Sequence, residues 1–501
     1  MDALHHIAYG FSLTLTPTNL LFCLSGVFIG TLIGVLPGIG PVGAISILLP
    51  VTFYTPPVST LIMLAGIFYG AQYGGSTTSI LVNIPGEATS VVTCLDGYQM
   101  ARQGRAGPAL GIAAFGSFIA GTLSTVALML IAPPLAEYAL KFGPPEYFSL
   151  MVVGMTFLIY LTSTSIVKAL MVAFAGIILA CVGMDTTSGV QRFTFGILDL
   201  SDGIGVVPLV MGLFGISEVL LNVEQSVTQT VFMERVKGLL PSRQDWRDSA
   251  GPIARGSVIG FLFGILPGAG SIVSTFISYG IEKRISRHPE RFGKGAIEGV
   301  AAPESANNAG VAGAFIPLLT LGIPSNAVMA IFLGALLMHG VQPGPMLMVN
   351  HPDVFWGVII SMYVGNAMLL LLNLPLIGLW VQVLKIPYRI LFPLILFFCL
   401  IGVYSINTSL FDVGIMLLFG VIGYLVRKFG YEPAPLVLAF VLGPMLEYSL
   451  RQSLTMSKGS FSIFFMRPIS GAVMLLTAMM LISSVIPRLG RLRRRIPKEE
   501  E

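Results

Sequence analysis

The chain has 501 residues, of which 54% are hydrophobic and 10% are charged, with a net charge of +4. A soluble domain carries about 25% charged residues, so this composition excludes a protein whose whole surface faces water. Apolar runs at 109–133, 353–384 and 468–487 approach or exceed the ~20 residues with which a helix spans a bilayer, whereas a transmembrane barrel alternates over segments of ~10 residues. The sequence therefore predicts an all-α polytopic membrane protein.

An internal repeat organises the chain. Residues 26–40 align with residues 256–270, and nine of these fifteen positions are identical. The similarity resumes at the Ile-Pro pairs that begin at residues 84 and 323. Two halves of common origin are therefore expected. The predicted divisions are a first half at 1–222, a cytoplasmic connector at 223–255, a second half at 256–487 and a basic tail at 488–501.

The first predicted element is a re-entrant hairpin at about 20–54. Its LPGIG segment, residues 36–40, lies in an apolar stretch, where Pro removes a helical hydrogen bond and Gly permits left-handed backbone. Backbone groups freed at membrane depth are tolerated only against protein or a water-filled cavity. The alternative is a plain kink or a seam of small residues between helices. No Lys or Arg precedes Arg102, so the hairpin is expected to enter from outside.

A broken helix is predicted next, at about 58–87. It contains YGGSTTSILVNIPGE at 73–87, which supplies consecutive hydroxyl groups, an amide and a Pro-Gly break. Hydrogen bonds from neutral groups are weaker than a buried Arg pair, so they suit a carboxylate ligand that must also be released. Alternatively, the hydroxyl groups bond back to their own helix and the glycines only permit close packing.

The helices between the hairpins set the orientation of the second half. An odd number of crossings would invert it, and five are predicted. They lie near 58–84, 109–132, 147–162, 165–184 and 203–222.

The second hairpin is predicted at about 256–281, with LPGAG at 266–270. Lys and Arg residues flank it on both sides, from Arg235 to Arg255 and from Lys283 to Lys294. Both flanks are therefore expected to be cytoplasmic. Because the first hairpin is expected to enter from outside, the sequence predicts an inverted-topology repeat.

A second broken helix is predicted at about 303–338, with PESANNAG at 303–310 and GIPSN at 322–326. The total is about eleven crossings plus two re-entrant hairpins. The crossings predicted after the second hairpin lie near 309–337, 353–384, 389–407, 411–427, 433–450 and 468–487. The tail at 488–501 holds six Lys and Arg residues, so the C-terminus is expected to be cytoplasmic. Arg451, Lys458 and Arg467 disagree with this topology, because they would face outward.

In an inverted repeat the binding site is expected near the bilayer midplane, where hairpin tips and broken helices meet. The candidate substrate-binding residues are Gly38, Gly40, Pro41, Ser76, Thr77, Thr78, Asn83, Gly268, Gly270, Ser271, Ser305, Asn307, Asn308, Ser325 and Asn326. Ionisable residues at membrane depth are functional candidates, and Glu87, Asp96 and Glu304 are the candidate ion-coupling residues. Unwound backbone near Gly38 and Gly268 could hold Na⁺. The four Cys residues are widely separated, and they predict neither a disulfide framework nor another metal site.

The chain resembles the large membrane subunit of the tripartite tricarboxylate transporter family, typified by the citrate-class carrier of bacteria. The resemblance covers nearly the whole chain. It rests on GVLPGIGP at 34–41 with LPVTF at 49–53, YGGSTT at 73–78 with IPGE at 84–87, GILPGAG at 264–270, and PESANN at 303–308 with PLLTLGIP at 317–324.

The resemblance implies a secondary transporter of the bacterial inner membrane that imports carboxylates. It implies two partners, a small membrane subunit of about four helices and a periplasmic binding protein that delivers the substrate. It also implies symport driven by a gradient of Na⁺ or protons, without another cofactor, and the chain lacks a phosphate-binding GxxxxGK[ST] loop. The substrate is expected to be a tricarboxylate or a related carboxylate.

Two other classes of protein remain as alternatives. A membrane channel also uses broken helices and exposed carbonyls, but an inverted repeat in one chain favours a carrier. A membrane enzyme or another non-transport module is the second alternative. The chain lacks HExxH and GxSxG, so no enzymatic activity is expected.

Overall fold

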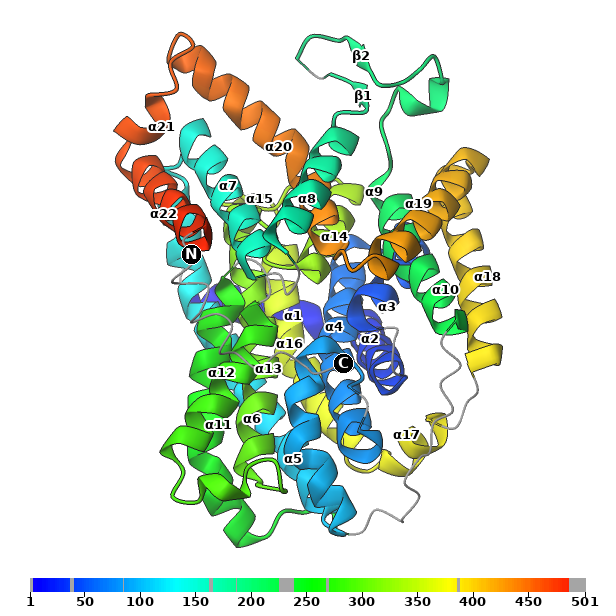
Figure 1. The fold of residues 1–501 in the computed structure, drawn as a ribbon, viewed down its shortest axis with the longest axis vertical. Coiled ribbons are helices and arrows are strands. Elements are labelled where there is room, and N and C mark those ends of the chain that lie inside the picture. The colour runs from blue at the N-terminus through cyan, green and yellow to red at the C-terminus, as the bar shows by residue number, and fades with distance from the viewer. Residues whose placement is uncertain are drawn as a thin grey trace.

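The computed structural model describes residues 3–36, 40–83, 85–161, 165–185, 187–224, 238–266, 270–384 and 388–485. These residues are almost entirely helical, and the strands among them are β1 (Gly183–Met184) and β2 (Gln191–Arg192), which pair antiparallel. Five helices are long and apolar enough to cross a membrane, and further apolar helices are shorter. The predicted all-α, multi-pass membrane fold is therefore confirmed (Figure 1).

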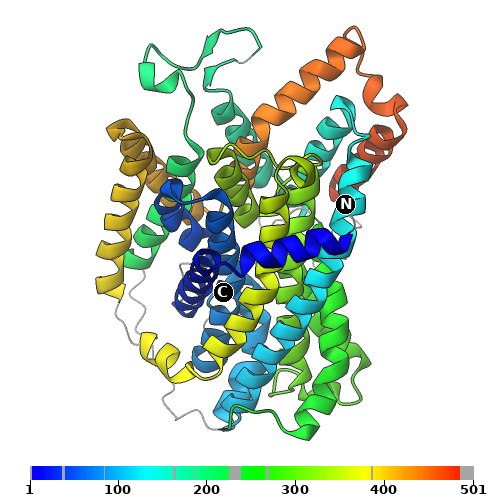
Figure 2. The same cartoon turned by 180° about the vertical axis from the view of Figure 1, so that it is seen from behind.

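The helices of the first half follow one another in chain order, and the longest connection, between α8 and α9, holds β1 and β2. They are α1 (Ala3–Thr14), α2 (Pro17–Val35), α3 (Gly40–Leu48), η1 (Leu49–Tyr54), α4 (Pro57–Val82), η2 (Ala88–Ser90), α5 (Val91–Arg102), α6 (Ala106–Ala139), α7 (Pro144–Leu161), α8 (Ile166–Ala180), η3 (Leu198–Leu200), α9 (Val206–Val210), the π-helical η4 (Met211–Ile216) and α10 (Ser217–Glu224). Helix α1 lies across the bundle, where the His6 ring stacks on Trp356 at 5.7 Å (Figure 2).

The second half begins after the connector. Its helices are α11 (Arg243–Ile265), α12 (Gly270–Ile285), η5 (Pro289–Arg291), α13 (Glu298–Leu321), α14 (Ala327–Met338), α15 (Leu347–Asn350), α16 (Pro352–Asn373), α17 (Ile377–Val383), α18 (Tyr388–Asn407), α19 (Leu410–Lys428), α20 (Ala434–Met456), α21 (Ile463–Met466) and α22 (Pro468–Val485). The crossing predicted at 353–384 is therefore wrong in one respect, because it divides into α16 and α17. Pro375 lies in the intervening turn, and proline stops a helix from continuing.

In the first half, α2 and α4 pack along a seam of glycines. Gly30 lies so close to α4 that a Cβ atom there would be 2.5 Å from Ile67 O. Each step of four residues along α2 moves the contact four residues along α4 in the same direction, so the two helices are parallel. The contacts are Gly26 with Met63, Gly30 with Ile67 and Gly34 with Ala71.

The second half repeats this seam between α11 and α13. Glycines again contact backbone at intervals of four residues, and again the numbers rise together. The contacts are Gly256 with Ala302, Gly260 with Ala306 and Gly264 with Gly310. The sequence repeat is therefore also a repeat of helix packing, in which small residues let two backbones approach closely.

The two halves are inverted, because α4 and α13 run antiparallel where they meet. As the residue number rises along α4 from Phe68 through Gln72 to Ser76, the number of the contacted residue on α13 falls. Phe68 faces Phe315 with ring centroids 6.4 Å apart, Gln72 lies at Asn307, and Ser76 bonds Glu304. Since α2 is parallel to α4 and α11 is parallel to α13, the two halves run in opposite directions. The predicted inverted repeat is therefore confirmed.

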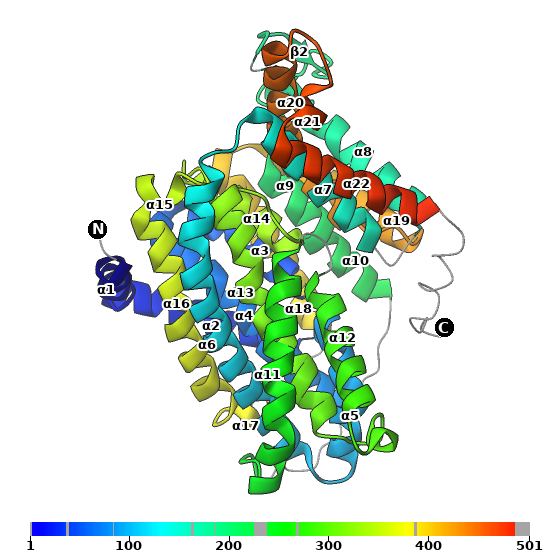
Figure 3. The same cartoon turned by 90° about the vertical axis from the view of Figure 1, so that its left-hand side faces the viewer.

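The ends of the bundle differ in how their charges are arranged. At one end, Gln103 donates to Lys294 O at 2.8 Å and Arg105 pairs with Asp245 at 2.6 Å, so several basic segments lie together. The opposite end holds β1, β2 and the end of α20 (Figures 1 and 3). There the two arginines that disagreed with the predicted topology are paired with acids. The pairs are Arg451 with Asp185 and Glu447, and Arg467 with Glu146.

Some predicted features lie outside the described residues. These are the two hairpin tips at 37–39 and 267–269, including Gly38 and Gly268 with their predicted Na⁺ site, a large part of the connector, and the basic tail at 488–501. The arms of each predicted hairpin are described, as α2 with α3 and as α11 with α12. The entry side of each hairpin stays a prediction.

Candidate functional site

The break after α4 brings a carboxyl group back against the helix it has just left. Helix α4 ends at Asn83, whose backbone is left-handed with φ of 59°. The chain then turns so that a Cβ atom on Gly86 would lie 2.5 Å from Gly75 Cα, and it would also overlap Gly34 O. Glycine at positions 34, 75 and 86 therefore lets three backbone segments meet. This contact seats Glu87 beside α4, within reach of α13.

Glu87 is buried, and its polar partners among the described residues are neutral. Asn307 Nδ2 on α13 donates to Glu87 Oε1 at 3.0 Å, and the Thr89 hydroxyl donates to the same oxygen. When the nitrogen of the Gln72 amide faces Glu87, it donates to that carboxylate and to Asn307 Oδ1, which lies 2.9 Å away. Helices α4 and α13 and the segment between α4 and α5 thus build one hydrogen-bonded cluster.

Glu304 is the second carboxyl group of this cluster. It is fully buried on α13, where the Ser76 hydroxyl of α4 donates to Oε2 and the Thr93 hydroxyl of α5 donates to Oε1. Ser76 lies one helical turn from Gln72, so the two carboxyl groups occupy neighbouring positions along α4. We refer to Gln72, Ser76, Glu87, Thr89, Thr93, Glu304 and Asn307 as the carboxyl cluster.

No cation balances these two acids among the residues that the structure describes, where neither Glu87 nor Glu304 forms an ion pair. Burying an unpaired carboxylate costs several kcal/mol, and two neighbouring carboxylates also repel each other. A bound proton or small cation relieves both penalties. The cluster therefore has the chemistry of a site that takes up positive charge.

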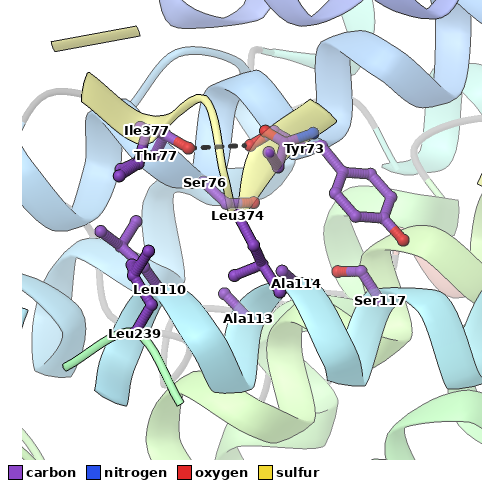
Figure 4. A pocket seen from close by; sticks show the side chains of 11 residues that line it. Tyr73, Ser76, Thr77, Leu110, Ala113, Ala114, Ser117, Leu239, Leu374 and Ile377 are labelled. Carbon is purple, nitrogen blue, oxygen red and sulfur yellow. Dashed lines mark hydrogen bonds between the residues drawn. The ribbon is translucent and has the colours of Figure 1, made fainter. Parts of the chain in front are cut away.

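A small pocket lies next to the carboxyl cluster and shares Ser76 with it (Figure 4). Hydroxyl groups from Tyr73, Ser76, Thr77 and Ser117 contribute to its wall. In Figure 4, Ser76 and Leu374 face Leu110, Ala113 and Ala114 of α6, while Tyr73 and Ser117 lie together at one end. The remaining lining residues are Leu239, Asn373 and Ile377. None of the described residues that line this pocket is charged, so a ligand there meets neutral donors and apolar walls from these residues.

The hydroxyl groups at the pocket are held by a second layer of amides. Asn308 Nδ2 donates to Ser117 Oγ at 2.7 Å, and the Tyr73 hydroxyl donates to Asn366 Oδ1 at 2.8 Å. The Asn366 amide in turn donates to Phe118 O at 2.7 Å. These bonds join α4, α6, α13 and α16, so the pocket wall is preorganised by buried polar contacts.

Asp96, a predicted ion-coupling residue, lies elsewhere and has a full set of hydrogen bonds. Its Oδ1 accepts from the backbone N–H groups of Gly293, Gly295 and Ala296 at 2.7 to 2.9 Å. Its Oδ2 accepts from the Tyr279 hydroxyl at 2.9 Å. Asp96 therefore ties α5 to the segment that leads into α13, and it has little capacity left for a cation.

Of the predicted substrate-binding residues, Ser76, Thr77, Asn307 and Asn308 lie at the cluster or the pocket. Others form structural contacts away from it: Thr78 donates to Val35 O, Ser325 donates to Ala314 O, and Asn326 caps α14. Asn83 is exposed, and Ser305 Oγ lies against Gly116 without a hydrogen-bond partner among the described residues. Gly40 and Pro41 begin α3, and Gly270 and Ser271 begin α12, next to the hairpin tips.

Several residues of this site were not predicted. Gln72, Thr89 and Thr93 become visible only once α4, α5 and α13 are packed together. Asn366 and Asn373 had a usable signal, because two amides seven residues apart in an apolar stretch share one face of a helix. Ser117 is one of several small polar residues on α6, and nothing in the sequence distinguishes it.

Comparison with known proteins identifies the family to which the sequence is similar. The profile of the "Tripartite tricarboxylate transporter TctA family" matches residues 20–438. A protein of Agrobacterium vitis, named "Uncharacterized 52.8 kDa protein in TAR-I ttuC' 3'region", is 50% identical over 501 residues, 100% of both chains. A second, "Uncharacterized protein in TAR-II ttuC' 3'region", is 48% identical over 242 residues, which are 48% of this chain and 100% of that protein. No solved structure matches.

Proposed function

The chain belongs to the tripartite tricarboxylate transporter TctA family, and from that premise we propose that it is a cation-gradient-driven symporter that imports carboxylates. The observation that carries this proposal is the pair of buried carboxyl groups, which have no cationic partner among the described residues, beside a pocket of neutral hydroxyl groups. Membership of a transporter family also favours a carrier over an enzyme.

The coupling follows from the electrostatics of the two sites. While Glu87 and Glu304 are both charged, a carboxylate in the adjacent pocket is repelled, and the low dielectric of the interior strengthens that repulsion. Each proton or Na⁺ taken up by the carboxyl cluster cancels one of its two negative charges and lowers the repulsion, so the anion binds after the cation. Loss of the cation on the other side of the membrane restores the repulsion and favours release.

The residues divide between these two tasks. Glu87 and Glu304 hold the coupling ion, and the amides of Gln72 and Asn307 offer oxygen atoms that suit Na⁺. Ser76, Thr77 and Ser117 donate hydrogen bonds to the carboxylate in the pocket. Ser76 contacts both sites, because it lines the pocket and donates to Glu304. Asp96 positions α5 and is not part of the coupling site.

The proposal includes the setting in which the chain works. It is the large subunit of an inner-membrane carrier that also contains a small membrane subunit of about four helices. A periplasmic protein delivers the carboxylate to the end of the bundle that holds β1 and β2. The opposite end, where Arg105 and Lys294 lie, faces the cytoplasm together with the C-terminus.

Uptake into proteoliposomes tests this function. The vesicles hold the chain and its small partner, with a loaded binding protein outside, a panel of labelled carboxylates, and Na⁺ or proton gradients imposed separately. Accumulation that needs both a gradient and the binding protein supports a tripartite symporter and identifies the ion. Flux that stays passive and unsaturable under every gradient would instead indicate a channel.

A further inference from the structure

The amide of Gln72 reaches into a group of oxygen atoms beside Glu87. Gln72 is 2% exposed on α4, one helical turn before Ser76. Four oxygen atoms surround one terminal atom of its amide. They are both carboxylate oxygens of Glu87, with Oε2 at 2.5 Å, and the Oγ1 atom of Thr89 and Oδ1 atom of Asn307, each at 2.9 Å. We refer to these four atoms as the oxygen cage.

The amide nitrogen of Gln72 is the atom that occupies the oxygen cage. Asn307 Nδ2 donates to Glu87 Oε1 at 3.0 Å, which fixes the Asn307 amide so that its oxygen faces Gln72. In the opposite orientation, the Gln72 amide would place its own oxygen against this carbonyl oxygen and against the Glu87 carboxylate. Because these groups only accept hydrogen bonds, that orientation is repulsive.

The oxygen cage holds more acceptors than an amide can satisfy. An amide nitrogen carries two protons, and four oxygen atoms face this one. Its N–H groups also point in fixed directions, whereas a small cation attracts every surrounding oxygen atom at once. Carboxylate, hydroxyl and amide oxygens are the ligands that hard cations prefer. The cage therefore suits a full positive charge better than the partial charge of an amide nitrogen.

We propose that Gln72 is a tethered competitor of the coupling cation: its amide nitrogen occupies the position that the cation takes, and the side chain leaves the oxygen cage when the cation binds. This inference rests on the proposed cation-coupled transport and identifies what regulates its cation site. The N–H groups of Gln72 stabilise the charged form of Glu87 by hydrogen bonds. Gln72 therefore lowers the affinity for the cation and favours its release after transport.

A permanent positive charge at position 72 tests the proposal. In Gln72→Lys, an ammonium group replaces the amide nitrogen, and it is expected to occupy the oxygen cage as the cation does. Carboxylate exchange in proteoliposomes is the measurement, with and without the ion that drives wild-type uptake. Omission of this ion is expected to slow wild-type exchange at least about 10-fold, because both carboxyl groups then repel the substrate. The same omission should leave exchange by Gln72→Lys unchanged, and accumulation against a gradient should be lost.

Two further variants separate the added charge from general damage. Gln72→Met is the matched neutral variant, because methionine is similar in length to lysine and carries no charge, and it is expected to keep the requirement for the ion. Ser59→Ala removes another buried polar contact of α4, since Ser59 donates to Asn19 Oδ1 at 2.6 Å outside the carboxyl cluster. It should also keep the requirement. Loss of the ion requirement in Gln72→Met as well as in Gln72→Lys would overturn the proposal.

The Tm of the purified chain supplies a second readout. The probe is NaCl in place of choline chloride, or a lowered pH, according to the ion that drives wild-type uptake. This ion is expected to raise the Tm of the wild type and not that of Gln72→Lys, whose cage already holds a charge. Gln72→Glu brings oxygen atoms in place of the nitrogen, so the same ion should raise its Tm by more than in the wild type. If Gln72→Lys fails to fold, an equal rise in Gln72→Glu and the wild type overturns the proposal.

The outcomes distinguish this inference from the proposed function. Wild-type uptake that needs no ion gradient would contradict the cation-driven function itself. Gradient-driven uptake by the wild type, together with an unchanged ion requirement in a folded Gln72→Lys protein, would leave that function standing and overturn the role of Gln72. Exchange that becomes independent of the ion in Gln72→Lys alone supports the role.

Discussion

The breaks that follow α4 and α13 share one backbone plan and differ in chemistry. They occupy equivalent positions of the repeat, 83–87 and 322–326. Each begins with a left-handed residue, Asn83 with φ of 59° and Gly322 with φ of 71°. Each ends just before the next helix, at Glu87 in the first half and Asn326 in the second. Glu87 joins the carboxyl cluster, whereas Asn326 only caps α14 by accepting from Met329 N at 3.0 Å. The two breaks thus share their backbone geometry, and the carboxyl group lies at the break of the first half.

The helices before the breaks show the same asymmetry. In the repeat, Gln72 and Ser76 of α4 correspond to Val311 and Phe315 of α13, which are apolar and buried. Because α4 and α13 are antiparallel, equivalent residues lie at opposite depths of the pair. The polar cluster therefore lies at one depth, and the aromatic contact of Phe315 with Phe68 lies at the other. An inverted repeat can place a polar site on one side of an apolar barrier in this way.

The largest effect is expected from removing charge at the carboxyl cluster. Glu304→Gln keeps a polar group of similar shape, and the Ser76 and Thr93 hydroxyls can rotate to match it, but it cannot take up a proton or bind a cation strongly. Accumulation against a gradient is expected to fall to the level without a gradient, while exchange of carboxylate across the membrane continues. Gradient-driven uptake and counterflow in the same vesicles measure the two activities.

Glu290→Gln is the matched control, because Glu290 is exposed and bonds only His288 in the described structure. It should leave both activities intact. Gradient-driven accumulation that persists in Glu304→Gln and in Glu87→Gln would show that the cluster does not couple transport, and that the difference between the two breaks has no role in it.

A large loss of stability is expected from Asp96→Ala. The substitution leaves three backbone N–H groups of 293–296 without their acceptor, and each unpaired buried donor costs about 1–3 kcal/mol. Partial access of water lowers the sum, so a destabilisation of roughly 2–4 kcal/mol is expected. The measurement is chemical denaturation of the purified chain.

Asp96→Asn sharpens the result, since it keeps one acceptor oxygen and is expected to be milder. The corresponding helix of the second half, α14, holds no acidic residue, so this tie exists in one half only. A stable Asp96→Asn protein that loses gradient-driven accumulation while it keeps exchange would instead place Asp96 in the coupling machinery.

An intermediate effect is expected when the two breaks exchange their small residues. Gly86 and Ser325 are equivalent, and they contact the equivalent residues Gly75 and Ala314. A side chain at position 86 would collide with backbone, so Gly86→Ser is expected to cost about 1–3 kcal/mol and to displace Glu87. Ser325→Gly loses one hydrogen bond, with an expected cost of about 1 kcal/mol. Thermal unfolding together with uptake measures both, and equal costs would show that the two breaks are packed alike.

More of the fold than of the candidate site could be predicted from the sequence. The LPGxG segments and their glycines predicted the repeat, and the contacts of Gly30 and Gly260 confirm it in three dimensions. Glu87 and Glu304 were found because charged residues are rare in apolar stretches. Gln72 and Thr93 were not found, because their contacts with the two carboxyl groups depend on how α4, α5 and α13 pack together. Asp96 looked equally functional, since no local pattern shows that three backbone amides about 200 residues away will bond it.

The smallest effect is expected at the second break. Asn326→Ala removes the cap of α14, which exposes one backbone N–H and typically costs about 1 kcal/mol. Asn326→Asp keeps the cap and adds a negative charge at the N-terminal end of the helix, where it is stabilised. Both variants should keep gradient-driven uptake, because the polar groups at this break serve the helix and not the ion. If Asn326→Ala abolished uptake with only a small change in Tm, the second break would also hold a ligand, and the two halves would contribute chemistry as well as geometry.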